Sequence, residues 1–131
     1  MYALSVTMDD RVFTKLVEFL EKVPAIVGTI GKGSEDGGRW WVKFEIDIYH
    51  QYAWHTVQEF GHVLNYMSVE ERLPTTFQPV SPPPYMNGGP EEYLSWVIEC
   101  HNPEFKPGTC AEWLIGRLPN PVEDLEQWEN E

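Results

Sequence analysis

The residues best suited to metal or acid–base chemistry are His55, Glu59 and His62. Their spacing of four and then three residues places all three side chains on one face of a helix. Imidazole and carboxylate groups are zinc ligands, and Glu59 with His62 spells the Glu-x-x-His of di-iron bundles. A di-iron site needs that pattern twice, on helices that face inward, and here it occurs once. We therefore favour a polar surface facing solvent or a partner, with a metal site as the alternative and no cofactor expected.

Other catalytic patterns are weaker. Glu45 and Asp47 stand two residues apart in a predicted strand, but a catalytic carboxylate pair needs different environments that separate the two pKa values, and both are predicted to be exposed. Cys100 and His101 are neighbours in sequence, which does not align a thiolate with a base. The chain has no Gly-x-Ser-x-Gly and no phosphate-binding glycine loop. We expect no enzymatic activity.

The clearest element is a strand over 39–48, predicted to form a hairpin with 25–30 through the loop 33–38. Its side chains alternate, so one set should face the core: Trp40, Val42, Phe44, Ile46 and Ile48. The other set should lie on the open face of the sheet: Trp41, Lys43, Glu45, Asp47 and Tyr49. Two acids flanked by Trp41 and Tyr49 suit a basic protein partner. The alternative is that the C-terminal segment covers Trp41.

A helix is predicted over 50–66, because apolar residues recur within a narrow arc: Ala53, Val57, Phe60, Leu64 and Met67. His55, Glu59 and His62 lie opposite that arc, with Gln51 and Tyr66 nearby. Exposed helix faces usually carry Lys and Glu, whereas His and Tyr lose less side-chain entropy when an interface buries them. Partner contact and plain solvation both remain open for this face.

The predicted order of elements is β-α-β-β-α-β-β with a helical end. It starts with a strand over 2–6 and a helix over 9–23. The first six elements match a ferredoxin-like, split βαβ core: an antiparallel sheet with two helices on one face. A strand over 93–100 and a short helix over 109–118 would be additions. We predict an α+β fold and a single domain over 1–131, with a Pro-rich connection at 79–90 and an acidic tail at 121–131.

The net charge of the chain limits the kinds of molecule that it is expected to bind. The chain carries 21 Asp and Glu against 9 Lys and Arg, a formal net charge of -12 at pH 7. Phosphate binding needs clustered Lys and Arg, which do not occur, so neither nucleic acid nor an anionic membrane is expected as a partner. A basic protein is the natural counterpart; acidity that only keeps the chain soluble is the alternative. The acidic end of the chain is either a solvated tail or a docking element anchored by Trp128.

The sequence also indicates the cellular location of the protein and the oxidation state of its two cysteines. We find no charged leader with an apolar run and no apolar stretch long enough to span a membrane, so cytoplasm is the expected location. Cys100 and Cys110 are too few for a disulfide scaffold. Reduced, packed thiols are favoured, and a bridge between them is left open.

In general character the chain resembles bacterial immunity proteins that neutralise toxins, including barstar-type inhibitors. The shared traits are small size, strong acidity, one α+β domain, aromatic-rich exposed strands and no catalytic signature. The resemblance implies a cytoplasmic inhibitor that blocks the active site of a basic toxin, often a nuclease, with carboxylates standing in for phosphates. The alternatives are a structural homodimer formed through the open sheet face and a small metal-binding protein or enzyme using His55, Glu59 and His62.

Overall fold

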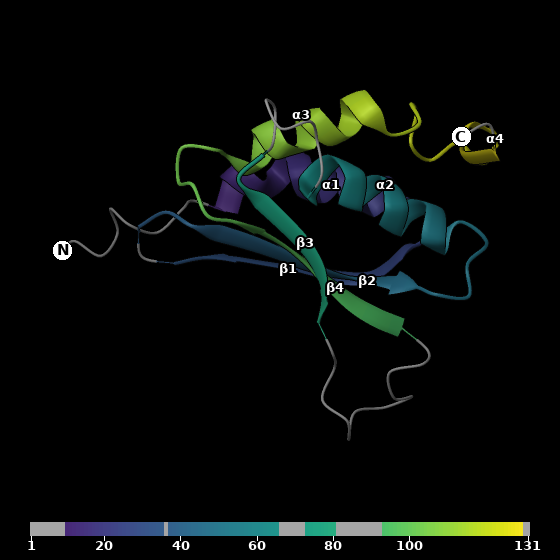
Figure 1. Ribbon diagram of the computed structural model, residues 1–131, viewed down its shortest axis with the longest axis horizontal. Helices are drawn as coiled ribbons and strands as arrows, with labels where there is room; N and C mark the ends of the chain where they lie inside the picture. The colour runs from purple at the N-terminus through teal and green to yellow at the C-terminus, as the bar shows by residue number, and fades with distance from the viewer. Residues whose placement is uncertain (1–9, 36, 66–72, 81–92, 130–131) are drawn as a thin grey trace, which may run out of the picture.

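The computed structural model describes residues 10–35, 37–65, 73–80 and 93–129. Four antiparallel strands form one sheet in the order β1-β2-β4-β3. Helices cover one face of the sheet and leave the other face without a described helix (Figure 1). The elements in chain order are a 3-10 turn Asp10–Phe13, α1 Thr14–Lys22, β1 Ile26–Ser34, β2 Trp40–Asp47, α2 Ala53–Asn65, β3 Thr75–Val80, β4 Tyr93–Cys100, α3 Pro107–Arg117 and α4 Leu125–Glu129. The predicted α+β class is confirmed.

The predicted hairpin forms between β1 and β2, with Ile26 opposite Ile46 and Ser34 opposite Trp40. The register shifts between Val27 and Gly31. Gly28 lies in this irregular stretch with a φ of 78°, a conformation that glycine adopts without steric cost. The strand therefore bends while its two ends stay paired with β2.

The place of β4 differs from the ferredoxin-like prediction. A split βαβ core would put the segment 2–6 between 40–48 and 73–80, but in the described sheet β4 fills that position. It pairs with β2 along its whole length, Trp40 opposite Cys100 through Asp47 opposite Tyr93, and with β3 on its other side. The strand at 93–100 is thus a central member of the sheet. Residues 2–6 lie outside the described part of the chain.

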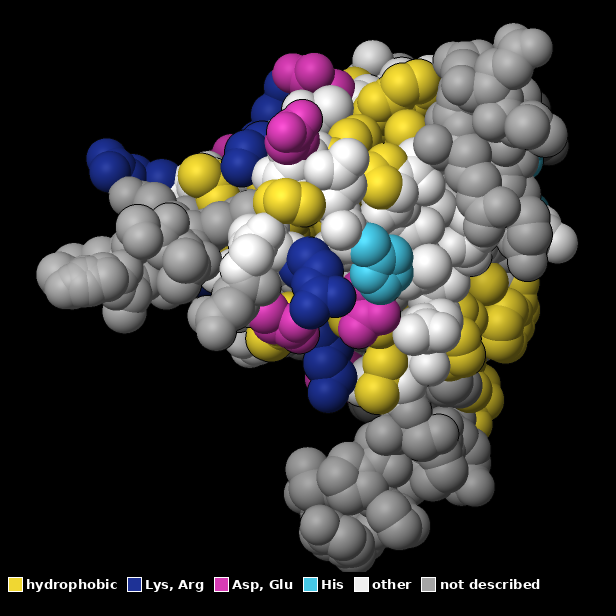
Figure 2. Space-filling view, turned by 60° about the vertical axis from the view of Figure 1, so that its left-hand side comes forward, with side chains coloured by type: hydrophobic (Ala, Val, Ile, Leu, Met, Phe, Trp, Pro, Cys, Tyr) yellow, Lys and Arg dark blue, Asp and Glu magenta, His cyan; other side chains and the backbone are white. Residues whose placement is uncertain are grey.

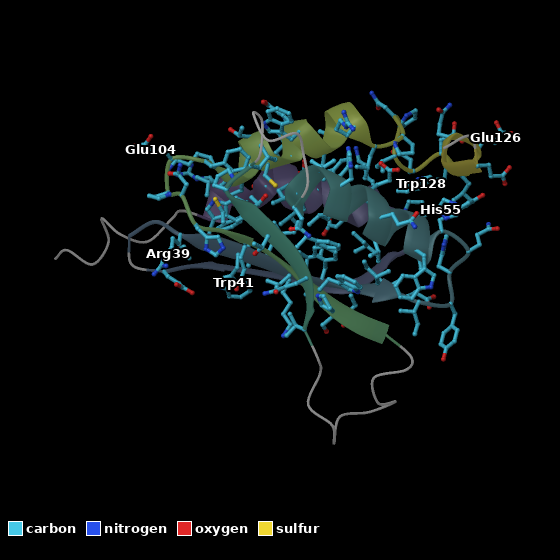
Figure 3. The ribbon with its side chains drawn as sticks, in the orientation of Figure 1. Arg39, Trp41, His55, Glu104, Glu126 and Trp128 are labelled. Atoms are coloured by element: carbon cyan, nitrogen blue, oxygen red, sulfur yellow. The ribbon has the colours of Figure 1, made fainter. Side chains whose placement is uncertain are left out.

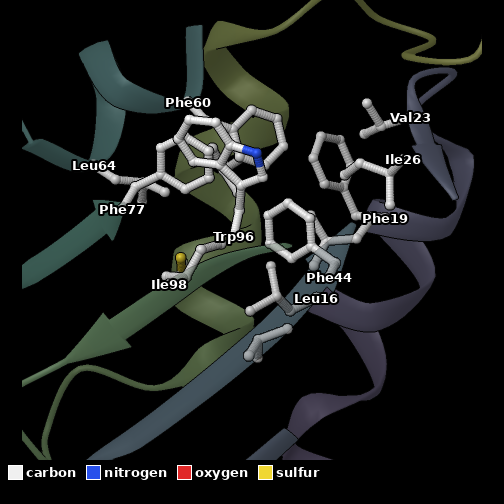
Figure 4. Packing of buried hydrophobic residues seen from close by; sticks show 14 of the residues in the cluster. Leu16, Phe19, Val23, Ile26, Phe44, Phe60, Leu64, Phe77, Trp96 and Ile98 are labelled. Atoms are coloured by element: carbon white, nitrogen blue, oxygen red, sulfur yellow. The ribbon is translucent and has the colours of Figure 1, made fainter. Parts of the chain in front are cut away.

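The core lies between the sheet and the helices. Alternation in β2 is confirmed, since Trp40, Val42, Phe44 and Ile46 are all buried. Phe77 stacks on Trp96 with ring centroids 4.9 Å apart, and Phe44 and Phe60 pack against Phe77 and against each other (Figure 4). Burial of several large aromatic rings supplies much of the free energy that holds this layer together.

Local sequence explains where the helices end. α1 stops at Lys22, just before Pro24, whose ring is incompatible with a helix interior. α3 starts at Pro107, a position where the missing N–H costs nothing. The segment predicted as an acidic tail is packed as far as α4, because Val122 and Trp128 are buried. Of the Pro-rich connection at 79–90, only Pro79 and Val80 are described, and both belong to β3.

None of the helices in the described residues has the length and apolar composition needed to cross a bilayer.

Candidate functional site

Two acidic stretches of the chain meet at one end of the molecule. No Lys or Arg stands between Lys43 and Arg72 or after Arg117. Parts of these stretches come together where α4 packs beside the start of α2, at the right of Figure 1. The Tyr52 ring stacks on Trp128, with centroids 6.3 Å apart. We call the residues 47–55 and 122–129 the acidic end; its carboxylates are Asp47, Glu123, Asp124, Glu126 and Glu129.

Trp128 holds this end together from inside. Its exposed fraction is 0%, and its Nε1 donates a hydrogen bond of 2.7 Å to the carbonyl oxygen of Val122. The prediction that Trp128 contacts a partner is therefore wrong. A ring with an apolar body and one donor gains more from the Tyr52 stack and the Val122 carbonyl than from solvent. Its role is to fix α4, and with it the carboxylates, against α2.

Tyr52 provides a second attachment. Its hydroxyl donates to Oε2 of Glu129 at 2.9 Å. Burial is the main reason that the pKa of Tyr52 is raised above its ordinary value, and the hydrogen bond to Glu129 and the charge of Glu129 raise it further. The phenol therefore stays protonated at neutral pH and remains a donor to the carboxylate.

Two large rings stand exposed at the acidic end. Tyr49 is 72% exposed and Trp54 is 54% exposed. The loop that presents Tyr49 is fixed by side chains: Asp47 Oδ1 accepts from the Tyr49 N–H and His50 Nδ1 accepts from the Tyr52 N–H, both at 3.0 Å. The prediction of an exposed Tyr49 beside Asp47 agrees with this geometry.

Trp54 was not among the predicted contact residues. Helical spacing carries the signal, because Trp54 falls outside the apolar arc of α2, on the same outward side as Gln58 and His62. A tryptophan at such a position leaves a large apolar surface in water. Exposed apolar surface of this kind is typical of interaction sites.

The open sheet face carries Trp41, Lys43 and Glu45, as predicted, but Trp41 does not share one patch with Tyr49. Trp41 and Asp47 are six strand residues apart, about 20 Å, and Trp41 lies at the opposite end of the molecule from Trp128 (Figure 3). α3 and α4 lie on the other side of the sheet, so they do not cover Trp41 (Figure 1).

Trp41 is half-buried because it rests on its own sheet. A Cβ added at Gly33, its partner across the β1–β2 ladder, would come within 2.5 Å of the indole ring. Gly31 is close to the same ring, with 3.8 Å from an added Cβ. The glycines of β1 thus form a flat bed for the indole, which gives Trp41 a structural role that the sequence prediction did not assign to it.

The side chains of His55, Glu59 and His62 are not gathered into a metal site. His55 meets the Tyr52 ring edge-on at 5.6 Å, whereas His62 Nε2 lies 2.8 Å from Arg117 Nη2. Glu59 is half-buried and has an interaction of its own. Within the described ranges, no three His, Cys, Asp or Glu residues are placed to hold a metal ion. Tyr66, predicted on the same face, lies outside those ranges.

The opposite end has mixed charge. Lys15 Nζ lies 2.9 Å from Glu112 Oε2, and Arg39 Nη2 lies 3.9 Å from Glu35 Oε1. Figure 2 looks toward this end and shows basic, acidic and histidine side chains side by side. We call this part of the molecule, which includes Lys15, Arg39, Trp41 and Glu112, the mixed end. Basic and acidic side chains lie side by side there, so it offers no extended surface of one sign.

The two thiols belong to the interior at the mixed end. Cys100 and Cys110 are buried and not bonded to each other, as the prediction of reduced, packed thiols had it. Burial raises the pKa of both thiols, and for Cys110 the neighbouring Cys100 adds to the effect. Protonated, enclosed thiols are poor nucleophiles.

Comparison with known protein families, curated proteins and solved structures finds no match to this chain.

Proposed function

We propose that this protein is a non-enzymatic acidic binding module that docks onto a basic protein as an inhibitor of the immunity-protein kind. One observation carries the proposal: five carboxylates and two exposed aromatic rings share the acidic end, and its two segments contain no Lys or Arg. Such a surface is complementary to a cationic partner in both charge and contact chemistry.

The two kinds of side chain have different tasks in docking. Carboxylates of one sign attract a cationic partner over a distance of about 8 Å at physiological salt and speed its association. Exposed Trp and Tyr then supply the apolar contact area that slows dissociation. Trp128 matters indirectly, because it fixes α4 before any partner arrives and so lowers the ordering cost of binding.

An inhibitory role agrees with this arrangement. An enzyme that acts on an anionic polymer lines its active site with cations, and a rigid group of carboxylates can occupy that site in place of phosphates. A basic nuclease toxin is therefore the class of partner that we propose.

The test starts with affinity capture from the native organism on immobilised wild-type protein. The captured protein is then purified, and its binding is measured by surface plasmon resonance. Exchanging Glu123 and Glu126 for Lys should slow association by about tenfold or more, because steering depends on the net charge of the docking surface. Raising the salt concentration should slow association of the wild type in the same direction.

The matched control is the double exchange Glu18→Lys and Glu21→Lys in α1, which alters net charge by the same amount on exposed residues elsewhere. It should slow association far less than the acidic-end pair. Equal effects of the two double variants, or association that salt does not change, would contradict the proposal.

A further inference from the structure

The two edges of the sheet differ in how their backbone groups are used. In the described part of the chain, β1 and β3 are the edge strands. In an antiparallel pair, every second residue turns its N–H and C=O toward the partner strand, and the residues between turn theirs away. The outward groups of an edge strand are a template for one more strand unless something covers them.

The β3 edge is covered by a side chain. Asn65 Oδ1 accepts the Phe77 N–H at 2.8 Å, and Asn65 Nδ2 donates to the Phe77 carbonyl oxygen at 2.9 Å. Two residues further along β3, Pro79 has no N–H to offer. The amide of Asn65 thus takes the place of a neighbouring strand, so β3 is closed to another chain.

The β1 edge has an open stretch. The Glu35 N–H donates to the Arg39 carbonyl oxygen at 2.7 Å, so these two residues form a hydrogen-bonded pair. By alternation Gly33 and Gly31 also turn their backbone groups to β2, and Lys32 between them turns its groups outward. No described strand lies on that side of β1. The register shift disrupts the earlier part of β1, so we call residues 30–33 the open edge.

A groove runs beside the open edge. It has a volume of about 300 Å³ and lies between β1 and the start of α1, with Phe13, half-buried Val17 and Lys32 among its lining residues. The Lys32 side chain is on the helix side of the sheet, because its partner in β2 is the buried Val42. A strand added at the open edge would place every second side chain in this groove. Addition of an extended peptide to a sheet edge, with pockets for alternate side chains, is an established mode of recognition.

The charge of the groove selects the kind of strand. In a chain of net charge -12, the charged residues that line the groove are Arg11, Lys32 and Glu18, two basic and one acidic. Lys32 is exposed and attracts a carboxylate on an incoming strand. It also opposes a second copy of this chain, because two paired β1 edges would bring two Lys32 side chains together. An acidic segment of another protein is therefore the favoured occupant.

The other side of an added strand would meet an apolar surface. Gly31 and Gly33 are on the open face of the sheet, and the half-buried Trp41 ring lies close to both. Glycines at an edge leave room for the side chains of a neighbouring strand to reach that indole ring. Apolar side chains on this side, alternating with carboxylates on the groove side, match the two surfaces.

From these features we propose that the open edge of β1 binds an extended acidic segment of a partner protein as a fifth strand of the sheet. The backbone of the segment pairs with the N–H and C=O of Lys32. Its carboxylates face the groove and the Lys32 ammonium group, and its apolar side chains contact Trp41. This site does not depend on the docking of a basic protein, which uses the acidic end, and the two proposals can fail separately.

The experiment uses proton–nitrogen NMR of the whole protein with a capped hexapeptide of alternating valine and glutamate. It is done at physiological salt, which screens long-range repulsion by the net charge. The peptide should move the backbone N–H signal of Lys32 and slow its exchange with water, with a dissociation constant of about 0.1–1 mM, since a short peptide loses entropy on ordering. The Phe77 N–H is the internal control and should not change, because Asn65 already accepts it.

Two further peptides separate strand pairing from simple attraction. The same hexapeptide with all of its backbone nitrogens methylated keeps the side chains but has no donors, and it should bind at least about tenfold more weakly, a loss of 1.4 kcal/mol. A hexapeptide of alternating valine and lysine keeps the donors but has the opposite charge, and it should also bind more weakly than the glutamate peptide.

A change of charge in the protein tests the groove. Lys32→Glu should weaken binding of the glutamate peptide by about tenfold or more. Lys22→Glu, the same exchange at an exposed position in the last turn of α1, is the matched control and should bind nearly as the wild type does. Both variants should fold, because both side chains are exposed.

Four results would overturn the proposal. The first is an unchanged Lys32 N–H at roughly 10 mM peptide, about tenfold above the expected dissociation constant. The second is equally tight binding of the methylated peptide, which would mean that no strand is added. The third is equally tight binding of the lysine peptide. The fourth is slow exchange of the Lys32 N–H without any peptide, which would mean that a second copy or this chain itself covers the edge.

Discussion

The acidic end and the mixed end of this molecule are built from the same kinds of residue and have opposite characters. At the mixed end, Lys15 and Arg39 have acidic neighbours, and Trp41 lies flat over Gly31 and Gly33. At the acidic end, the carboxylates have no nearby Lys or Arg in their segments, and Tyr49 and Trp54 stand in solvent. Net charge by itself therefore says little about docking; what counts is where the balancing cations are missing.

The largest expected contrast lies between two tryptophans of the acidic end. Trp128→Ala should lower the free energy of unfolding by about 3–5 kcal/mol, because it empties a fully enclosed site. Trp54→Ala should change it by less than about 0.5 kcal/mol, since the ring is mostly in water. Urea denaturation followed by circular dichroism measures both. A Trp128→Ala loss below that of Trp54→Ala would mean that α4 is not anchored as described.

Two glycines test the packing of Trp41. Gly33→Ala should cost about 1–3 kcal/mol through overpacking, because the new methyl group would collide with the Trp41 ring. Gly61→Ala should instead stabilise the fold by up to about 1 kcal/mol, as an alanine in a helix with open space around it. The same denaturation experiment gives both values. If Gly33→Ala has no cost, Trp41 is free to move and belongs with the exposed rings.

Alkaline pH should act on the mixed end through Cys110. The unfolded thiol ionises near pH 9.0, whereas burial raises the pKa of the folded thiol. Stability from this group is therefore complete below pH 9 and falls as pH rises, by up to about 1.4 kcal/mol per pH unit. The Cys110→Ala variant should have a lower free energy of unfolding at pH 8 than the wild type, and this free energy should fall less between pH 8 and pH 10. Parallel curves for the two proteins would contradict the assignment.

The smallest contrast compares one bond at each end. Tyr52→Phe removes the hydroxyl that Glu129 accepts and should cost about 1 kcal/mol. Lys15→Met removes an exposed ion pair and should cost about 0–0.5 kcal/mol. A double-mutant cycle with Glu129→Gln isolates the Tyr52 interaction. A coupling energy near zero would show that the Tyr52–Glu129 hydrogen bond does not help to hold α4.

The sequence predicted the elements that have one buried face. Alternation across Trp40–Asp47 and the apolar arc of α2 were both readable, because a half-buried strand and a half-buried helix each impose a period on the chain. The same periods correctly placed Trp41 and Tyr49 outside the core. Burial of Cys100 and Cys110 without a disulfide bond was the favoured of two predictions, a bridge between them having been left open.

The strand order and the tail could not be read in the same way. Between residues 10 and 80, a split βαβ core and the observed fold share the same order of helices and strands, and the pairing of β4 with β2 separates them. That pairing depends on contacts between distant segments, which leave no local pattern. α4 has five residues, too few to show a period, and the burial of Trp128 depends on Tyr52 in another part of the chain.

Candidate contact residues were harder to predict than buried ones. Asp47, Tyr49 and His55 were predicted and lie at the acidic end. Trp54 was missed because the helix face was chosen by its titratable side chains, and the indole of Trp54 is not one of them. Trp41 and Trp128 were both predicted to contact a partner. The local sequence around a tryptophan does not distinguish a ring that packs within its own chain from one that contacts a partner.

The absence of Lys and Arg from the acidic end has a practical consequence for proteolysis. Trypsin, which cuts after basic residues, has no cleavage site from 44 to 71 or after Arg117, so it can report only on the opening of other regions. A protease specific for glutamate finds Glu123, Glu126 and Glu129 around α4. Because glutamates also occur elsewhere in the chain, only the fragments cut at these three residues would report the loosening of α4.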